Sequence, residues 1–144
     1  MQFATFHDLE DQSIFITGGG SGIGADLTKG FLSQGSKVTF IQRSNPEKFL
    51  IDCKGKYKHE PSFLECDVTN TKELKTALQR TAKKQGPISV LVNNAANDTR
   101  HSLGEFTSEQ WDKTMNVNLK PHFFAAQEVV EGMKKNGGGS IINF

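Results

Sequence analysis

The alternation of apolar and polar positions along the chain predicts five short β-strands separated by helices. Each predicted strand is a run of β-branched or other apolar residues, and the runs cover residues 13–17, 37–42, 61–68, 88–94 and 140–144. The run at 88–94 is almost entirely apolar, which is typical of a parallel sheet with helices on both faces. This alternation predicts an open α/β sheet of parallel strands, with ligands at their carboxyl ends.

Two helices are predicted between the first three strands. The first begins in the glycine-rich stretch after residue 17, carries apolar residues at helical spacing and stops at Gly35. The second has Pro46 in its first turn and Ser44 or Asn45 as its N-cap, and it fades near Gly55. Its weak pattern predicts a short element.

Capping boxes predict where the next two helices begin. Asn70 and Glu73 have the spacing of a capping box, and the helix that they open stops at Gly86. Thr107 and Gln110 repeat this spacing at the start of a longer helix, which Gly137 ends.

The longer helix is predicted to bury one stripe and to bend once. Pro121 cannot donate a hydrogen bond to the carbonyl of Val117, so the helix should kink close to Asn118. The apolar positions expected to form the buried stripe are Met115, Leu119, Phe123, Ala126, Val130 and Met133.

Composition and charge favour a small ligand. The 144 residues contain 17 Lys and Arg and 16 Asp and Glu, giving a formal net charge of +1, and the basic residues are dispersed. A nucleic-acid or membrane surface would instead require clustered basic residues. We therefore expect a small-molecule substrate, and neither a nucleic-acid partner nor a membrane.

The remaining features of composition predict a single cytoplasmic domain, residues 1–144. The N-terminus lacks a basic segment followed by an apolar run, and no stretch approaches the ~18 apolar residues of a membrane span. Cys53 and Cys66 lack redox or zinc-site spacing, so we expect reduced, packed thiols. The four histidines lack ligand spacing, which gives no support for a catalytic metal.

A glycine-rich loop joins the first predicted strand to the first predicted helix. Its sequence, T-G-G-G-S-G-I-G, covers residues 17–24. Backbone N–H groups and the helix dipole can hold a diphosphate at such a junction. We assign Gly18 to the turn, Gly22 to close approach of the backbone to the ligand, and Gly24 to helix packing.

Two other interpretations of this loop are weaker. A merely flexible loop would not be expected between an apolar strand and an amphipathic helix that are followed by further strand and helix units. A P-loop for ATP or GTP requires a lysine after the glycines, and this sequence has none there. A dinucleotide is the better ligand.

The ordered motifs resemble those of the short-chain dehydrogenase/reductase family. They are T-G-x-x-x-G-I-G at 17–24, Asp67 after the third strand, N-N-A-A at 93–96, and Asn118 within N-V-N-L. The resemblance extends along nearly the whole chain. It implies a Rossmann-like, doubly wound parallel sheet, here truncated after the fifth strand.

The resemblance also implies roles for individual residues. In the family the glycine loop wraps the pyrophosphate, the aspartate after the third strand contacts adenine, and the N-N-A-G segment lies beside the nicotinamide ribose. Ala96 stands where glycine is usual, and Asn118 matches the helix asparagine of a proton relay. The implied cofactor-binding residues are Gly18, Ser21, Gly22, Ile23, Gly24, Asp67, Val68, Asn93 and Ala95. Hydrogen bonding that ties neighbouring strands is an alternative role for Asn93 and Asn94.

The end of the second strand bears on the choice between NAD and NADP. A carboxylate there accepts a hydrogen bond from the ribose 2′-OH of NAD, whereas arginine pairs with the extra phosphate of NADP. This chain has Gln42 and Arg43 at that position, which favours NADP. The alternative is that Arg43 is an ordinary surface charge.

Within the family, the chain is most similar to the branch of D-xylose and related aldose 1-dehydrogenases. That branch oxidises a sugar hemiacetal to a lactone, and its NAD-using members carry an acid at the end of the second strand. The similarity implies a carbonyl or sugar substrate. Asp98, Arg100 and His101 could approach a polyol, or they could be solvated loop residues.

The proton-transfer residues of the family are incomplete in this sequence. The family uses a serine and a Tyr-x-x-x-Lys motif after the fifth strand, but the single tyrosine, Tyr57, is followed four residues later by Pro61. Only Asn118 can be assigned a catalytic role. We therefore expect a fragment that is inactive alone, with Ile141, Ile142 and Phe144 uncovered at an open sheet edge.

Three functions remain open at this point. The first is a short-chain NAD(P)-dependent oxidoreductase that transfers a hydride to or from a carbonyl or alcohol and forms homo-oligomers. The second is a non-catalytic dinucleotide-binding or interaction module. The third, an S-adenosylmethionine-dependent transferase, would not be expected to contain N-N-A-A and N-V-N-L.

Overall fold

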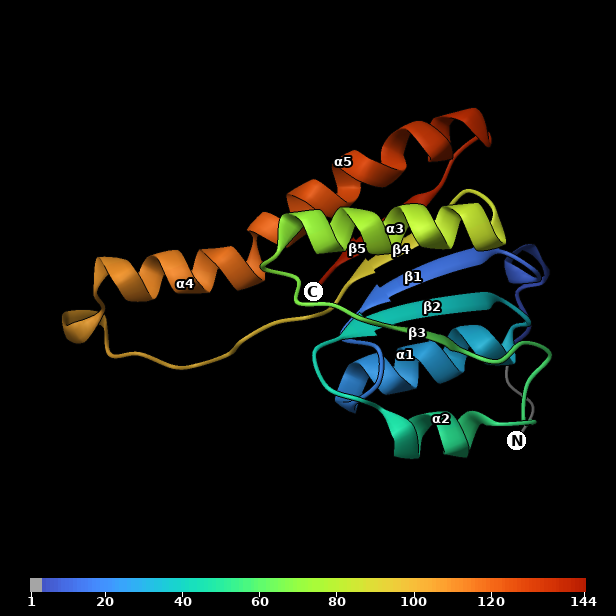
Figure 1. The fold of residues 1–144 in the computed structure, drawn as a ribbon, viewed down its shortest axis with the longest axis horizontal. Coiled ribbons are helices and arrows are strands. Elements are labelled where there is room, and N and C mark those ends of the chain that lie inside the picture. The colour runs from blue at the N-terminus through green and yellow to red at the C-terminus, as the bar shows by residue number, and fades with distance from the viewer. Residues whose placement is uncertain (1–3) are drawn as a thin grey trace.

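The chain folds around one parallel β-sheet, as the sequence predicts. The computed structural model describes residues 4–144. The sheet has the strand order β3-β2-β1-β4-β5, and all neighbouring strands run parallel (Figure 1). The strands are β1 (Ser13–Thr17), β2 (Lys37–Gln42), β3 (Ser62–Glu65), β4 (Val90–Asn93) and β5 (Ser140–Asn143).

Helices cover both faces of the sheet, which gives the doubly wound, Rossmann-like arrangement (Figure 1). Helices α1 and α2 pack on one face, and α3 and α5 pack on the other. The α-helices are α1 (Gly22–Ser33), α2 (Glu47–Cys53), α3 (Thr71–Gln85), α4 (Ser108–Asn118) and α5 (Lys120–Lys135); short 3₁₀ turns cover His7–Leu9 and Leu103–Glu105.

Alternate residues of the strands supply two separate cores. On one face, Phe15 and Leu91 pack with α3 and α5. On the other face, Ile16, Phe40 and Val92 pack with α1 and α2. Each of these five side chains is fully buried, so burial of apolar surface on both faces holds the sheet in place.

Strands β3 and β4 end earlier than the sequence predicts because the residues after them turn away to form other hydrogen bonds. β3 stops at Glu65 rather than at residue 68, and Asp67 then accepts bonds from the backbone and hydroxyl of Thr69. β4 stops at Asn93, and the next residue, Asn94, bonds to Thr17 of β1. Both departures occur at the carboxyl edge of the sheet.

The predicted cap of α2 is wrong, whereas that of α3 is confirmed. Pro46 occupies the N-cap of α2 and provides no side-chain bond within the described chain, so neither Ser44 nor Asn45 caps this helix. For α3, the Asn70 side chain accepts a hydrogen bond from the Glu73 backbone, as the predicted capping box requires.

The predicted long helix is broken into α4 and α5 rather than kinked. Thr107 forms the predicted capping box with Gln110 at the start of α4. Leu119 lies between the helices with φ −128° and ψ −52°, and the N–H of His122 donates to its carbonyl. Pro121 then stands in the first turn of α5, where the missing N–H has no cost.

The break also makes part of the predicted buried stripe wrong, although Met133 is buried as predicted. Leu119 and Phe123 are 59% and 63% exposed. The buried residues of α5 are Pro121, Ala125, Val129 and Met133. A single buried stripe requires one continuous helix. Helices α4 and α5 are separated by the break, so each buries its own face, and packing against α3 and β4 determines which face α5 buries.

Strand β5 forms one edge of the described sheet, and its side chains are exposed, as predicted. Ile141 and Ile142 are 39% and 41% exposed, and Phe144, just after the strand, is 61% exposed. Both cysteines, Cys53 and Cys66, are buried free thiols, which confirms that prediction. Within residues 4–144, every helix is too short or too polar to cross a bilayer.

Candidate functional site

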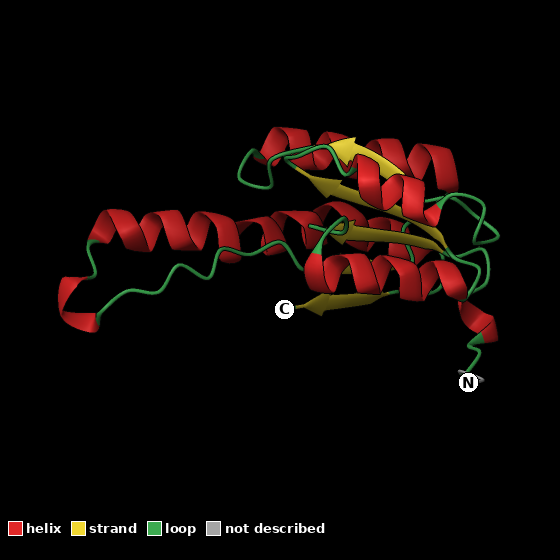
Figure 2. Cartoon of the chain, turned by 90° about the horizontal axis from the view of Figure 1, so that it is seen from below, coloured by secondary structure: helices red, strands yellow, loops and turns green. Residues whose placement is uncertain are grey.

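A cavity of about 550 Å³ lies at the carboxyl ends of the first four strands. Figures 1 and 2 show the strands pointing toward the side from which α4 extends. Nine residues predicted to bind a cofactor line the cavity: Gly18, Ser21, Ile23, Gly24, Gln42, Arg43, Asp67, Val68 and Ala95. The structure therefore gathers residues from four separate loops around one space.

The glycine loop is shaped by close contacts between its own backbone atoms. Gly18 has φ +70°, a conformation that favours glycine. A Cβ atom on Gly24 would collide with the carbonyl of Gly18 and would lie 2.7 Å from Nδ2 of Asn94. Helix α1 can therefore begin directly against the end of β1 only if Gly24 has no side chain.

Gly22 lies outside the cavity lining. Its φ is +50°, and beyond its chain neighbours and its own helix backbone no heavy atom of the described residues lies within 4 Å of the position that a Cβ would take. There is thus space for a ligand to approach the backbone at Gly22, but its assignment to the cofactor site stays a prediction.

The start of α1 can bind an anion. The first hydrogen bond of this helix runs from the N–H of Ala25 to the carbonyl of Ser21. The N–H groups before Ala25 therefore have no acceptor within the helix, and the helix dipole adds partial positive charge there. Ser21, the N-cap, makes no capping bond with its side chain within the described residues, and it lines the cavity.

Thr17 and Asn94 join the glycine loop to the end of β4. The hydroxyl of Thr17 accepts hydrogen bonds from the N–H groups of Asn94 and Ala95, each 2.9 Å long. Nδ2 of Asn94 donates in return to the carbonyls of Thr17 and Gly18, at 3.1 and 3.2 Å. Asn94 thus ties neighbouring strands together, as the alternative role predicted.

Asn93 does not line the cavity. Its side chain is fully buried, and its Nδ2 donates a 2.8 Å bond to Oδ1 of Asn143 on the neighbouring β5. Its Oδ1 has no partner among the described residues. The contact that Asn93 makes is therefore the inter-strand bond, and its assignment to the cofactor stays a prediction.

At the end of β2, Gln42 contacts the glycine loop and its own turn. Its Oε1 accepts a 3.0 Å bond from the N–H of Gly20, and its Nε2 donates a 2.8 Å bond to the carbonyl of Ser44. Arg43 is exposed and lines the cavity. At this end of the cavity, the guanidinium of Arg43 therefore lies next to the amide of Gln42, which is already hydrogen-bonded to the backbone.

Asp67 lies at the same end of the cavity, with its carboxylate held by the next turn. Oδ1 accepts bonds from the backbone and hydroxyl of Thr69, at 2.9 and 2.8 Å. The backbone N–H is the largest influence and lowers the pKa of Asp67; the hydroxyl and the charge of Arg43 act in the same direction, against a smaller opposing effect of burial. Asp67 is thus charged at neutral pH.

Asn118 clamps the loop that follows β4. Its Oδ1 accepts from the N–H of Asn97, and its Nδ2 donates to the Asn97 carbonyl, both at 2.8 Å. The neighbouring Val117 lines the cavity, whereas Asn118 does not. Each end of the amide group thus makes one bond to Asn97, and the assignment of Asn118 to a proton relay stays a prediction. The N–H of His122 donates to the carbonyl of Leu119 rather than to that of Asn118.

Sequence reasoning missed several residues of the cavity wall, among them Ser44, Thr69, Asn97 and Val117. Loop residues such as these have no periodic signal, although their positions next to assigned residues could have suggested them. The three residues that could approach a polyol do not all line the cavity. Asp98 lines the cavity, Arg100 does not, and the His101 ring stacks at 4.9 Å on Phe106.

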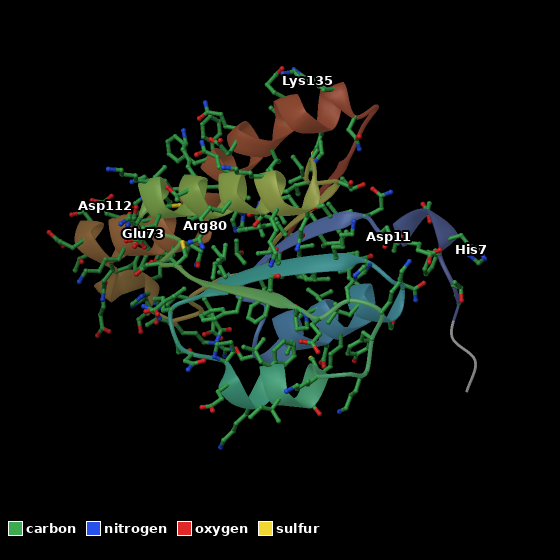
Figure 3. All side chains as sticks on the ribbon, turned by 45° about the vertical axis from the view of Figure 1, so that its right-hand side comes forward. His7, Asp11, Glu73, Arg80, Asp112 and Lys135 are labelled. Carbon is green, nitrogen blue, oxygen red and sulfur yellow. The ribbon has the colours of Figure 1, made fainter. Side chains whose placement is uncertain are left out.

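A cluster of charged residues around Asp11 lies away from the cavity. Asp11 bonds with Lys58 and His59 at 2.9 and 2.6 Å. Figure 3 shows Asp11 at the end of the sheet opposite to Glu73, which belongs to the first turn of α3. Tyr57 packs partly against the core on the α1 and α2 face. The carboxyl edge is thus the part of the molecule where the predicted site residues gather.

Comparison with known proteins identifies the fold and its relatives. The family model described as short chain dehydrogenase matches residues 12–144. The probable galactose dehydrogenase GalD of Rhizobium meliloti (strain 1021) is 41% identical over 142 residues, which are 96% of this chain and 55% of that protein. The D-xylose 1-dehydrogenase of Caulobacter vibrioides (strain NA1000 / CB15N) is 40% identical over 145 residues, covering 100% of this chain and 57% of that protein.

A solved structure agrees with this comparison. The blue fluorescent protein from a metagenomic library, solved in complex with NADPH, aligns with a TM-score of 0.83 and 28% identity, over 94% of this chain and 56% of that one. The chain spans about half the length of the relatives that it matches. Because the family model covers nearly all of it, the chain belongs to the short chain dehydrogenase family.

Proposed function

We propose that this chain is the cofactor-binding part of an NAD(P)-dependent oxidoreductase. The observation that carries the proposal is that residues from four loops, including the start of α1, surround one cavity at the carboxyl edge of the sheet. Parallel α/β sheets bind dinucleotides at this edge, with the pyrophosphate at the first helix N-terminus. A structural relative is complexed with NADPH, which supports this ligand.

The chemistry of the cavity suggests how the dinucleotide lies. The adenosine half would lie near Asp67 and Arg43, because Oδ2 of Asp67 makes no hydrogen bond within residues 4–144 and can accept from a donor. The nicotinamide half would lie near Ala95 and Val117 at the other end of the cavity. The glycine loop lies between these ends in the sheet, which suits a central pyrophosphate.

The bound nicotinamide would supply hydride acceptance or donation. The residues of this chain would orient it, and Asn97, fixed on both sides by Asn118, would keep the wall of the cavity rigid. We propose a sugar as substrate, because two relatives are named galactose and D-xylose 1-dehydrogenase. Asp98 is the cavity residue best suited to accept hydrogen bonds from sugar hydroxyls.

Titration of the chain with NADPH and NADH tests this proposal. We expect saturable binding, measured by calorimetry and by the change in nicotinamide fluorescence, with an increase in Tm. A Gly24→Ala variant should lose most of this binding, because the new Cβ would collide with the carbonyl of Gly18. Absence of binding in a folded sample would contradict the proposal.

A non-catalytic dinucleotide-binding module is the second candidate. The residues of this chain supply the lining of a dinucleotide cavity, and binding alone would account for it. Formation of NAD(P)H from NAD(P) and D-xylose or D-galactose, measured on a sample of verified mass, would exclude this second candidate.

A further inference from the structure

A threonine lies in the middle of the buried face of α1. The buried residues of this helix are Gly24, Thr28 and Leu32, and Thr28 is fully buried. A buried hydroxyl needs a hydrogen-bond partner, because burying it without one is costly. Oγ1 of Thr28 donates a 2.8 Å bond to the carbonyl of Gly19, nine positions earlier in the glycine loop. The helix is therefore tied to the loop that precedes it.

This bond differs from the one that a threonine within a helix can make to its own helix. Such a hydroxyl can donate to the carbonyl four residues earlier. Thr81 of α3 does so: it is 2% exposed, and its Oγ1 donates a 2.9 Å bond to the carbonyl of Ala77. The hydroxyl of Thr28 instead bonds outside its helix, so it acts on the conformation of the glycine loop.

The peptide group between Gly19 and Gly20 is held at both ends. Its carbonyl accepts the bond from Thr28, and its N–H, which belongs to Gly20, donates a 3.0 Å bond to Oε1 of Gln42 at the end of β2. A trans peptide group is planar, so its N–H and its carbonyl point in opposite directions. Two bonds made from opposite sides therefore fix the orientation of the whole group.

The space around this peptide group is narrow. A Cβ atom on Gly19 would lie 2.5 Å from Cβ of Phe40 and 2.9 Å from Oγ1 of Thr28. A Cβ atom on Gly20 would collide with Oε1 of Gln42. The loop is thus packed between β2 and α1, and the two bonds can form because neither glycine has a side chain.

The fixed peptide group lies just before the N–H groups that can bind an anion. These N–H groups belong to the start of α1, before Ala25, and Ser21 directly follows the fixed group in the chain. Rotation of the fixed group would change the backbone angles of Gly20, which glycine allows more readily than any other residue. The direction of the next N–H groups therefore depends on the bonds that prevent this rotation.

We propose that Thr28 is a positioning residue for the pyrophosphate of the dinucleotide, and that its hydroxyl acts by holding the peptide group between Gly19 and Gly20. This inference rests on the proposed function and deepens it. Thr28 does not line the cavity, so its effect passes through the loop. A loop that is already held in one conformation loses less conformational entropy when it binds a ligand, which raises the affinity.

Two probes separate the pyrophosphate from the rest of the ligand. Adenosine 5′-diphosphate carries the pyrophosphate, and adenosine lacks it. Thr28→Val keeps the shape of the side chain and removes the donor, so the Kd of adenosine 5′-diphosphate, measured by calorimetry, should rise about five- to tenfold. The Kd of adenosine, measured by NMR titration, should not change.

Two further substitutions at the same position isolate the hydroxyl. Thr28→Ser keeps the donor and should bind adenosine 5′-diphosphate nearly as tightly as the natural chain. Thr28→Ala lacks the donor and has a high helix propensity, so it repeats the comparison if valine prevents folding. Equal losses of affinity in the serine and valine variants would show that packing of the methyl group matters instead, and would overturn the inference.

Thr81→Val is the matched control, because it removes a similarly buried hydroxyl from another helix. It should lower Tm, as Thr28→Val should, but leave both Kd values unchanged. Circular dichroism verifies that each variant is folded. An unchanged Kd of adenosine 5′-diphosphate in folded Thr28→Val, or an equal rise in Thr81→Val, would overturn the inference and leave the proposed function standing. If the natural chain binds neither this probe nor NADH or NADPH, the proposed function itself is contradicted.

A double substitution tests whether Thr28 and Gln42 act on the same peptide group. Gln42→Leu removes the bond at the other end and should also raise the Kd of adenosine 5′-diphosphate. Because the two side chains share one peptide group, the effect of Thr28→Val should differ between the natural and the Gln42→Leu background. Additive effects would show that the two bonds act independently, and would overturn the inference.

Discussion

At the residue scale, small polar side chains and absent side chains shape the cavity more than its charges do. Oε1 of Gln42 accepts a bond from the N–H of Gly20, and Nδ2 of Asn94 donates to the carbonyls of Thr17 and Gly18, so both side chains fix backbone atoms of the glycine loop. Gly24 contributes by having no Cβ. A ligand at this site therefore meets a backbone already held in one conformation, which lowers the ordering cost of binding.

Arg43 is the residue that should decide between the two cofactors. In Arg43→Ala we expect the affinity for NADPH to fall about tenfold or more, with the affinity for NADH little changed, because only NADPH loses an ionic hydrogen bond. Fluorescence titration measures both affinities. Arg80→Ala, on the exposed surface of α3, is the control. An unchanged ratio would rule out the assignment of Arg43.

Alanine substitutions at two glycines of α1 should have opposite effects on the free energy of unfolding. Gly24→Ala should lower the free energy of unfolding by about 1–3 kcal/mol, because the new Cβ overlaps the Gly18 carbonyl. Gly30→Ala should raise it by about 0.5–1 kcal/mol, because Gly30 lies within the helix with open space around it. Urea denaturation measures both values. Equal effects would contradict this explanation of Gly24.

At the element scale, contacts between strand ends fix the loops that the strands carry. The Thr17 hydroxyl is the central acceptor between β1 and the residues after β4. Similarly, Asn118 joins the end of α4 to the loop at Asn97. These bonds connect residues that are 21 to 78 positions apart in the chain.

Replacing Thr17 with valine should test the first of these connections. The shape of the side chain is kept, but two partly buried N–H groups lose their acceptor, at a cost of about 1–3 kcal/mol. Thr76→Val is the control, because that hydroxyl donates an exposed bond to the carbonyl of Lys72 within the same helix. Chemical denaturation gives the difference, and equal losses in the two variants would argue against a special role for Thr17.

The Asn118 connection predicts a local effect. In Asn118→Ala, backbone hydrogen exchange should become faster at Asn97 and its neighbours, since both bonds to the loop disappear. Exchange in β1, which is fully buried, should not change. Mass spectrometry of deuterated peptides separates the two regions. Unchanged exchange around residue 97 would show that the clamp does not hold the loop.

How much of the fold and of the cavity could be predicted depends on how far apart in the sequence the interacting residues are. Strand runs, the capping boxes at Asn70 and Thr107, and the glycine loop depend on neighbours a few positions away, and the sequence predicts them. The partners of Gln42 and Asn93 lie 22 and 50 positions away, so no local pattern indicates them. The break at Leu119 also resets the helical phase, which periodicity alone cannot detect.

At the scale of the whole molecule, the cavity and the charged cluster around Asp11 occupy opposite ends of the sheet. Lys58 bridges Glu10 and Asp11, and His59 also contacts Asp11. This cluster joins the segment before β1 to the segment before β3. Changes there should alter stability and leave dinucleotide binding unaffected.

The Asp11 cluster predicts how stability depends on pH. Hydrogen bonds from Lys58 and then His59 lower the pKa of Asp11 from 3.8 to about 2. A lowered carboxyl pKa stabilises the fold above the unfolded pKa, so this contribution should be complete above about pH 4 and lost as the pH falls toward 2. Urea denaturation between pH 5 and pH 2 measures this effect. Asp11→Asn should make the free energy of unfolding less dependent on pH, and an unchanged pH dependence would contradict the role of the Asp11 cluster.

The bonds between Thr17 and Asn94 have a consequence for the order of events during folding. Their 77-residue separation means that the glycine motif cannot take its final form until β4 has docked beside β1. A nascent or proteolysed piece that stops short of residue 94 would contain every glycine of the motif and still lack a cradle for phosphate. Nucleotide binding should therefore appear late in folding, and its appearance would indicate that the central strands have assembled.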